Sequence, residues 1–358
     1  VTVEEIIEIS TVEELKAFRD DVNNGNTYKS KKVVLVNDLD LNLGKYTVAS
    51  DGTVTFSEDA EQWTPIGTET NYFVGIFDGQ GHTISGLYIN KPKEKWQGLF
   101  SFAREGAFIQ NIILKNINIQ SGSTCGGICA FVSYADVNKC AVYGNIRCYV
   151  NSDGISTTQS NNGGIIGLAS HANISNCYNF ATINVGENNK KNFVYIGGIL
   201  GNLNSNTIVK NCYNLGILNG TQTIGGIVGH SASSSNNEIK NCYNLGTLNG
   251  TLNYCGGILA SLRYNIKIEN CYNAGILNGT STYKGSIIGY IVNDSTNNIT
   301  INRCSYLTGT ATAGIGYTAD SSLSIEPSND LPSVLSVING DNAFTTDSEG
   351  NIVLKFEN

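Results

Sequence analysis

Several features that would point to a particular function are scarce or missing in this 358-residue chain. It has 4 prolines and no methionine, and charged residues make up only 15% of it. No run of about 18 apolar residues occurs, so we expect no membrane-spanning helix. The net charge of −8 opposes binding to a phosphate backbone, which makes nucleic acid a poor partner. Hydrophobic residues still make up 41% of the chain, enough for a folded core.

Acidic residues are sparse in the middle of the chain, which argues against polysaccharide cleavage there. Enzymes of that kind use paired carboxylates or an acid-lined calcium site. The acids between positions 120 and 320 share no position in the repeat described below; they are Asp136, Asp153, Glu187, Glu238, Glu269, Asp294 and Asp320. The three histidines, His82, His171 and His230, are scattered. No His-Glu-x-x-His zinc motif, phosphate-binding loop or nucleophile elbow occurs. We therefore expect no catalytic residue, no metal and no cofactor.

Glycine, by contrast, is abundant, with 40 copies, and many of them lie in a repeated motif. Gly-Gly-Ile occurs at positions 126–128, 163–165, 197–199, 225–227 and 256–258. A degenerate copy stands at Gly285-Ser286-Ile287, and an early relative at Gln97-Gly98-Leu99. Neighbouring copies are about 30 residues apart, a period typical of repeat architectures.

Two further motifs recur between these glycines. Asn-Cys-Tyr-Asn occurs at positions 176–179, 211–214, 241–244 and 270–273. Leu-Asn-Gly-Thr begins at Leu218 and Leu248, and Leu277 begins a third copy. Each unit thus has three short strand-like pieces separated by Gly or Asn turns. A leucine-rich repeat has one strand per unit, and a propeller blade needs four strands and about 40 residues.

The sequence therefore predicts an all-β protein, a right-handed parallel β-helix of about seven to eight three-strand coils. Equivalent strands of successive coils then stack about 4.8 Å apart. We assign residues 46–310 to the repeats, residues 1–45 to an N-terminal cap and residues 311–358 to a C-terminal cap.

Both caps have helix signals. Thr11-Val12-Glu13-Glu14 is a capping-box pattern, and the apolar residues after it predict an amphipathic helix over 11–23. Near the other end, Asn329-Asp330 precedes Leu331-Pro332, which favours a short helix. A final strand is expected from Ile352 to Phe356.

These motifs resemble the GLUG-repeat family of bacterial secreted and cell-surface proteins, named for a Gly-Leu-any-Gly core. The core stands here as Gly164-Ile165-Ile166-Gly167, Gly198-Ile199-Leu200-Gly201 and Gly226-Ile227-Val228-Gly229. The segments Trp63 to Gly67 and Phe73 to Ile84 resemble the opening module of such proteins. The resemblance covers about residues 5 to 345. It implies a β-helix with an adhesin-like or scaffold role, secreted or at the cell surface. Some members are joined to IgA-cleaving metallopeptidases, whose zinc motif is absent here.

Six cysteines recur once per coil and should form one column: Cys140, Cys177, Cys212, Cys242, Cys271 and Cys304. We favour a stack of buried, reduced thiols, because cysteine is among the most buried residue types. A disulfide ladder is geometrically conceivable, whereas metal binding lacks the usual Cys-x-x-Cys pair. The first asparagine of each Asn-Cys-Tyr-Asn motif should form a hydrogen-bonded ladder at a corner: Asn176, Asn211, Asn241 and Asn270.

A row of tyrosines is the candidate for ligand binding: Tyr178, Tyr213, Tyr243 and Tyr272. Each follows a column cysteine, so alternation along the strand turns it outward if the cysteine points inward. Such a row can stack on sugar rings or on a protein, or it can simply stabilise the sheet. Two long segments, Val150 to Asn162 and Gly186 to Asn192, should bulge from one side and form part of the docking edge.

Three functions remain open on the sequence alone. The leading hypothesis is a non-catalytic extracellular adhesin-like or scaffold module, monomeric, that binds a glycan or a host or cell-surface protein. A polysaccharide-degrading hydrolase or lyase is the alternative, and convergent carboxylates in a groove would favour it. A passive surface stalk is the third.

Overall fold

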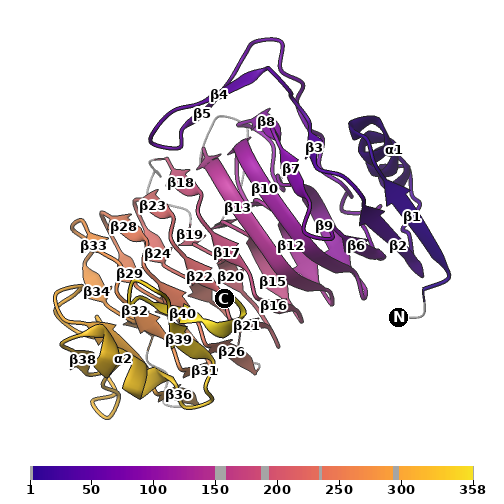
Figure 1. Cartoon of the computed structure of the whole chain (residues 1–358). Helices are drawn as coiled ribbons and strands as arrows, with labels where there is room; N and C mark the ends of the chain where they lie inside the picture. Colours follow the sequence, from indigo (N-terminus) through magenta and orange to yellow (C-terminus); the bar gives the residue numbers. More distant parts are fainter. Residues whose placement is uncertain (1–2, 150–158, 187–192, 234–235, 293–297, 358) are drawn as a thin grey trace.

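The computed structural model describes residues 3–149, 159–186, 193–233, 236–292 and 298–357. The chain forms a parallel β-solenoid of about nine turns (Figure 1). The predicted parallel β-helix is confirmed, but the predicted number of coils was too low. The reason is that the first and last coils lack the Gly-Gly-Ile motif on which the count depended.

Two of the sheets, of six and seven strands, take one strand from each of successive coils. One comprises β11 (Cys125–Gly126), β14 (Gln159–Gly163), β19 (Phe193–Gly197), β24 (Thr223–Gly225), β29 (Tyr254–Gly256) and β34 (Tyr283–Gly285). The other comprises β9 (Phe100–Arg104), β12 (Cys129–Ser133), β15 (Ile166–Ser170), β20 (Leu200–Leu203), β25 (Val228–Ser231), β30 (Leu259–Leu262) and β35 (Ile288–Ile291).

The large sheet contains three short strands from each of the later coils. The first row is β16 (Asn173–Ser175), β21 (Ile208–Lys210), β26 (Asn237–Lys240), β31 (Ile266–Glu269) and β36 (Ile299–Asn302). The second is β17 (Tyr178–Asn179), β22 (Tyr213–Asn214), β27 (Tyr243–Asn244), β32 (Tyr272–Asn273), β37 (Ser305–Leu307) and β38 (Pro327–Ser328). The third is β18 (Thr182–Val185), β23 (Ile217–Gly220), β28 (Thr247–Gly250) and β33 (Leu277–Asn278). All of these pairings are parallel and keep equivalent motif positions in register.

The early coils extend the large sheet towards the N-terminus. Their strands are β1 (Glu5–Ile9), β2 (Lys31–Leu35), β3 (Leu39–Asp40), β6 (Ile76–Asp78), β7 (Thr83–Ser85), β8 (Tyr88–Lys91) and the long β10 (Phe108–Ser121) and β13 (Asp136–Cys148). β1 pairs in parallel with β2, and β2 pairs with β6. The first coil strands thus lie in segment 1–45, which the sequence assigned to an N-terminal cap made of a helix and a first strand.

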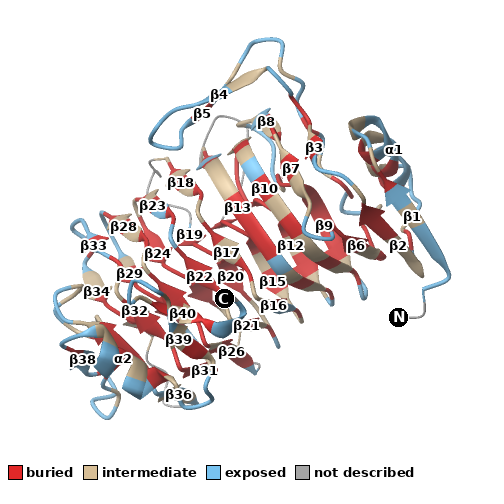
Figure 2. Cartoon of the chain, in the orientation of Figure 1, coloured by how far each residue is buried: buried red, intermediate tan, exposed pale blue. Residues whose placement is uncertain are grey.

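One continuous apolar core runs along the inside of the solenoid (Figure 2). In a single coil, Ile227, Ile239, Cys242 and Leu248 are all fully buried. Burial of each of the three aliphatic side chains contributes roughly 1.5–3 kcal/mol to the stability of the folded chain. The core ends at the N-terminus under α1 (Val12–Asn23), whose N-cap Thr11 and Glu14 form the predicted capping box. Its Leu15, Phe18 and Val22 are buried, as the apolar stripe predicts.

Two antiparallel hairpins lie outside the coils. The hairpin of β4 (Tyr46–Val48) and β5 (Val54–Phe56) projects over the early part of the large sheet (Figure 1). At the C-terminus, α2 (Leu331–Ile338) is capped by Asp330 and followed by β39 (Phe344–Thr346) and β40 (Ile352–Leu354). The predicted last strand ends at Leu354 rather than Phe356, because a 3-10 turn, η1 (Lys355–Glu357), follows. Within the segment 311–358 that the sequence assigned to a C-terminal cap, α2 with its N-cap and the β39–β40 hairpin occupy residues 330–354, and from here on we call these residues the C-terminal cap. Part of it folds back along the side of the solenoid.

Candidate functional site

The column cysteines lie inside the solenoid. Five of the six are fully buried and Cys304 is 8% exposed, and all ten cysteines of the chain are free thiols in the structure. Burial raises the pKa of Cys242 and Cys271 well above the ordinary value, so these thiols stay protonated. The Cys242 thiol donates to the carbonyl of Lys240, 3.2 Å away. The column is therefore part of the core rather than a reactive centre.

The first asparagines of the motif form a corner ladder. Each of Asn176, Asn211, Asn241 and Asn270 has a left-handed backbone with φ between 51° and 54°, a conformation that asparagine tolerates well. Their amides are linked in series: Asn211 Nδ2 to Asn176 Oδ1 is 3.1 Å, and Asn241 Nδ2 to Asn211 Oδ1 is 3.0 Å. Asn270 continues the series to Asn241 at 2.9 Å. These contacts connect successive coils.

A second asparagine ladder lies deeper, and sequence reasoning missed it. The last residue of each motif is buried: Asn179, Asn214, Asn244 and Asn273. The Asn214 Nδ2 donates to Asn244 Oδ1 over 2.8 Å, and Asn244 Nδ2 donates to Asn273 Oδ1 over the same distance. A Cβ placed on Gly226 would collide with the Asn244 amide. The Gly-Gly motif thus leaves room for this ladder. The regular occurrence of Gly-Gly-Ile together with Asn-Cys-Tyr-Asn in the same coils was the sequence signal that could have predicted it.

The predicted tyrosine row faces outward from the coils, but most of it is not accessible. Its rings stack in series with centroids 4.8 to 5.1 Å apart. Tyr213, Tyr243 and Tyr272 are 6%, 1% and 0% exposed, because the C-terminal cap packs on them. The Tyr272 hydroxyl donates to the Ile352 carbonyl over 2.5 Å. The interpretation of these three residues as an open ligand surface is corrected: the row holds the cap, and only Tyr178 remains partly exposed.

The two long segments of the predicted docking edge fall largely outside the described residues, at 150–158 and 187–192. The first segment follows β13 and the second follows β18, and these two strands pair in parallel. Both segments therefore leave the sheet at the same corner of the solenoid. Beside this corner the outer face of the large sheet is hollowed.

Two hollows of about 360 and 660 Å³ share Arg147, Asn184 and Asn219 in their linings. We call this continuous depression the amide groove. Its outward side chains form two columns, one residue per coil, set by the strand register. One column contains Asn118, Asn145, Thr182 and Ile217, and the other contains Gln120, Arg147, Asn184, Asn219 and Asn249.

The β4–β5 hairpin forms one border of the amide groove. The backbone N–H of Val54 donates to Asn145 Oδ1 over 2.7 Å, and Asn118 Nδ2 donates to the Val54 carbonyl over 3.0 Å. The ring of Phe56 stacks on Tyr88 at 4.6 Å, which fixes the base of the hairpin. Asp51, in the hairpin turn, is the one carboxylate that lines the described part of the groove, and it accepts from the Thr53 N–H.

The asparagines of the groove are linked into a third, partly exposed ladder. Asn219 Nδ2 donates to Asn184 Oδ1 over 2.7 Å, and Asn249 Nδ2 donates to Asn219 Oδ1 over 2.6 Å. Each amide has two N–H donors and two acceptor lone pairs, so these ladder bonds leave further capacity facing the groove. The exposed side chain of Ile217, 44% accessible, adds an apolar patch beside them.

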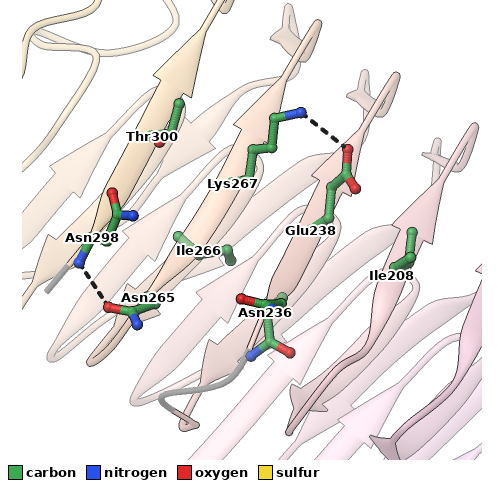
Figure 3. Close-up of a pocket in the computed structure, with 9 residues that line it drawn as sticks. Ile208, Asn236, Glu238, Asn265, Ile266, Lys267, Asn298 and Thr300 are labelled. Carbon is green, nitrogen blue, oxygen red and sulfur yellow. Dashed lines mark hydrogen bonds and ion pairs between the residues drawn. The ribbon is translucent and has the colours of Figure 1, made fainter.

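Another hollow, of about 370 Å³, lies on the first row of strands (Figure 3). Glu238 and Lys267 point towards each other across it, with Glu238 Oε1 3.8 Å from Lys267 Nζ. The same ammonium group lies 2.8 Å from Glu269 Oε2, so two carboxylates share one lysine. The hydrogen bond from Lys267 lowers the pKa of Glu269, which keeps this carboxylate ionised at neutral pH. A glycosidase pair needs one carboxyl with a raised pKa to protonate the leaving group, and Glu269 does not fit that role.

The histidines lie in three separate places. His82 contacts Asp38 over 3.1 Å, and the ring of His171 stacks on Tyr134 at 4.2 Å. His230 stacks on Tyr195, and burial lowers its pKa to about 4. Among the described residues, no group of three or more His, Cys, Asp or Glu side chains is arranged to hold a metal ion. In the same residues, neither helix has the length and apolar character to cross a membrane.

The comparisons with known proteins give partial matches. No protein-family model matches the chain. A protein proposed to be a Gly-rich membrane protein of Evansella cellulosilytica is 30% identical over 135 residues, which is 37% of this chain and 14% of that protein. Halomucin of Haloquadratum walsbyi is 28% identical over 129 residues, 35% of this chain and 1% of halomucin. The matches therefore span only a small share of either relative, and the resemblance to GLUG-repeat proteins stays an expectation.

A solved structure extends the likeness to nearly the whole chain. A protein of Bacteroides ovatus proposed to be an immunoglobulin A1 protease has a TM-score of 0.59 to this structure. The match covers 98% of this chain and 92% of that one at 16% identity. At this identity the likeness shows the fold alone.

Proposed function

We propose that this chain is a non-catalytic, extracellular carbohydrate-binding module of adhesin-like or scaffold type, and that the amide groove holds the glycan. The observation that carries the proposal is the ladder of Asn184, Asn219 and Asn249 along the groove. Sugar hydroxyls both donate and accept hydrogen bonds, and a carboxamide offers both functions at one side chain. The ladder bonds orient the amides before a ligand arrives, which lowers the entropy cost of binding.

The chemistry of the groove favours binding over cleavage. Hydrolysis of a glycosidic bond uses two carboxyl groups on either side of it. The described groove lining includes Asp51 alone, in the hairpin turn, whereas its other polar groups are amides, hydroxyls and Arg147. A role at the cell surface is supported by one partial relative, which is described as a membrane protein.

The test is a glycan array with the purified chain, run beside a polysaccharide-degradation screen. The groove variant is the double substitution Asn184→Ala/Asn219→Ala. Its matched control is Asn236→Ala/Thr300→Ala, which removes two polar side chains from the hollow of Figure 3. Circular dichroism and the melting temperature establish that both variants are folded.

We expect the array to reveal a glycan whose binding is lost in the groove variant and kept in the control. Binding that survives in the groove variant would place the site elsewhere. Release of reducing ends or unsaturated sugars by the unmodified chain would favour the polysaccharide-degrading enzyme. Absence of binding to every glycan would favour the passive stalk.

A further inference from the structure

Arg147 differs from every other residue in its column of the amide groove. The register aligns Gln120, Arg147, Asn184, Asn219 and Asn249 on successive coils, and Arg147 is the one charged member. Its side chain is exposed and lines both hollows of the groove. A repeat that places amides at this position therefore has a cation at one coil.

The guanidinium group is held in place by an aromatic ring rather than by a carboxylate. Its central carbon lies 4.8 Å from the centre of the Tyr149 ring. The Tyr149 hydroxyl donates to Gln120 Oε1 over 2.8 Å, which fixes that ring. In the part of the chain that the structure describes, no Asp or Glu oxygen lies within 4.0 Å of the Arg147 side chain. With respect to the described residues, the N–H edge of the oriented guanidinium therefore has no carboxylate partner and can bind a ligand.

Hydrogen-bond donors gather beside this cation. The ladder bonds of the groove run from higher-numbered to lower-numbered coils, with each Nδ2 donating to the preceding amide. Asn184 is the first amide of the series and lies next to Arg147 across the strand pairing. Its Nδ2 has no acceptor among the described residues. The guanidinium and this amide together make the part of the groove where the two hollows meet rich in donors.

We propose that the part of the groove where the two hollows meet binds an anionic sugar, with the guanidinium of Arg147 paired to a carboxylate or sulfate group and the asparagines bonded to neighbouring hydroxyls. The inference rests on the proposed function and names the class of glycan for the same site. A planar guanidinium matches the two oxygens of a carboxylate or sulfate in a bidentate geometry. Because Arg147 is the one charged residue in its column of the groove, the preference for an anionic ligand in this groove should depend on it.

The experiment measures dissociation constants by titration calorimetry with the whole chain and three probes. The probes are an oligogalacturonate, the neutral oligogalactoside of the same length, and a sulfated oligogalactoside. The variants are Arg147→Gln, which removes the charge, and Arg147→Lys, which keeps the charge but loses the planar fork. Arg263→Gln is the matched control, because Arg263 is also exposed and lies over a tyrosine ring, that of Tyr264 at 5.4 Å, outside the groove.

We expect an anionic probe to bind about tenfold to a hundredfold more tightly than the neutral one, the range for a charge-assisted bidentate contact. Arg147→Gln should remove this preference and leave neutral binding unchanged, whereas Arg263→Gln should keep it. The two anionic probes distinguish a carboxylate from a sulfate. Equal binding of all three probes, or a preference that survives in Arg147→Gln, would overturn the anionic assignment and leave the proposed function standing. Failure to bind any probe would overturn the inference together with carbohydrate binding in this groove.

Discussion

Replacing Asn244 by alanine tests whether the buried asparagine ladder holds the coils together. Asn244 Oδ1 accepts from the Gly246 N–H at 3.2 Å and from Asn214 Nδ2 at 2.8 Å. Its Nδ2 donates to the Gly246 carbonyl at 3.3 Å and to Asn273 Oδ1 at 2.8 Å. All four bonds are buried, so the substitution leaves their partner groups without a hydrogen bond from the protein and out of reach of water. At about 1 kcal/mol for each bond, with added cost for unsatisfied groups, we expect a loss of roughly 3–5 kcal/mol.

The assay is urea unfolding followed by circular dichroism and tyrosine fluorescence, with the slope m checked between variants. The matched control is Asn278→Ala, which loses one bond of 3.2 Å at an exposed position and should cost less than about 1 kcal/mol. Because solenoid stability is approximately a sum of coil and interface contributions, the loss should appear in the transition of the coils around Asn244. If Asn244→Ala unfolds within 1 kcal/mol of Asn278→Ala at equal m, the ladder does not stabilise the solenoid as argued.

Three further predictions concern the histidine, the thiols and the cap. His230 has a pKa of about 4 against an ordinary 6.5, so between these pH values the unfolded chain binds a proton that the folded chain does not. The free energy of unfolding should therefore fall as the pH drops below 6.5, by about 2–3 kcal/mol at pH 4.5. Urea unfolding of His230→Asn should show a smaller fall over the same pH range. An equal fall in the variant and the unmodified chain would contradict this assignment. Thiol titration should give no reaction in the folded state and ten thiols after denaturation, whereas four or fewer would show at least three oxidised pairs and contradict this. Phe344→Ala should lower the free energy of unfolding by roughly 3–5 kcal/mol, expose the tyrosine row and increase binding of a hydrophobic dye. The control is Phe356→Ala, at a position that is 39% exposed, which should leave dye binding unchanged. Equal dye binding by the two variants would mean that Phe344 does not hold the cap on the tyrosine row.

The repeats made the solenoid predictable, because each motif position has one structural environment in every coil. Gly-Gly-Ile, Asn-Cys-Tyr-Asn and Leu-Asn-Gly-Thr indicated the strands, and alternation placed Cys242 inside and Tyr243 outside the coil. The helix at Val12–Asn23 was predictable for a local reason, since its capping box and apolar stripe are short-range signals.

The covered tyrosine row and the amide groove were not predictable in the same way. The segment that contains Phe344 and Ile352 has no repeat, and its contact with Tyr272 joins residues 80 positions apart. The β4–β5 hairpin that borders the groove is likewise a single insertion. Arg147 stood out only after the strand register aligned it with Asn184, because the repeat lengths differ along the chain.

The most direct test of the account is a crystal structure of the chain with the oligosaccharide that binds best in the titrations. The account predicts sugar density along the amide groove, with hydroxyls within hydrogen-bond distance of Asn184 and Asn219. It also predicts an anionic group on the guanidinium of Arg147. Sugar bound at another face of the solenoid, or across the hollow of Glu238 and Lys267, would contradict it.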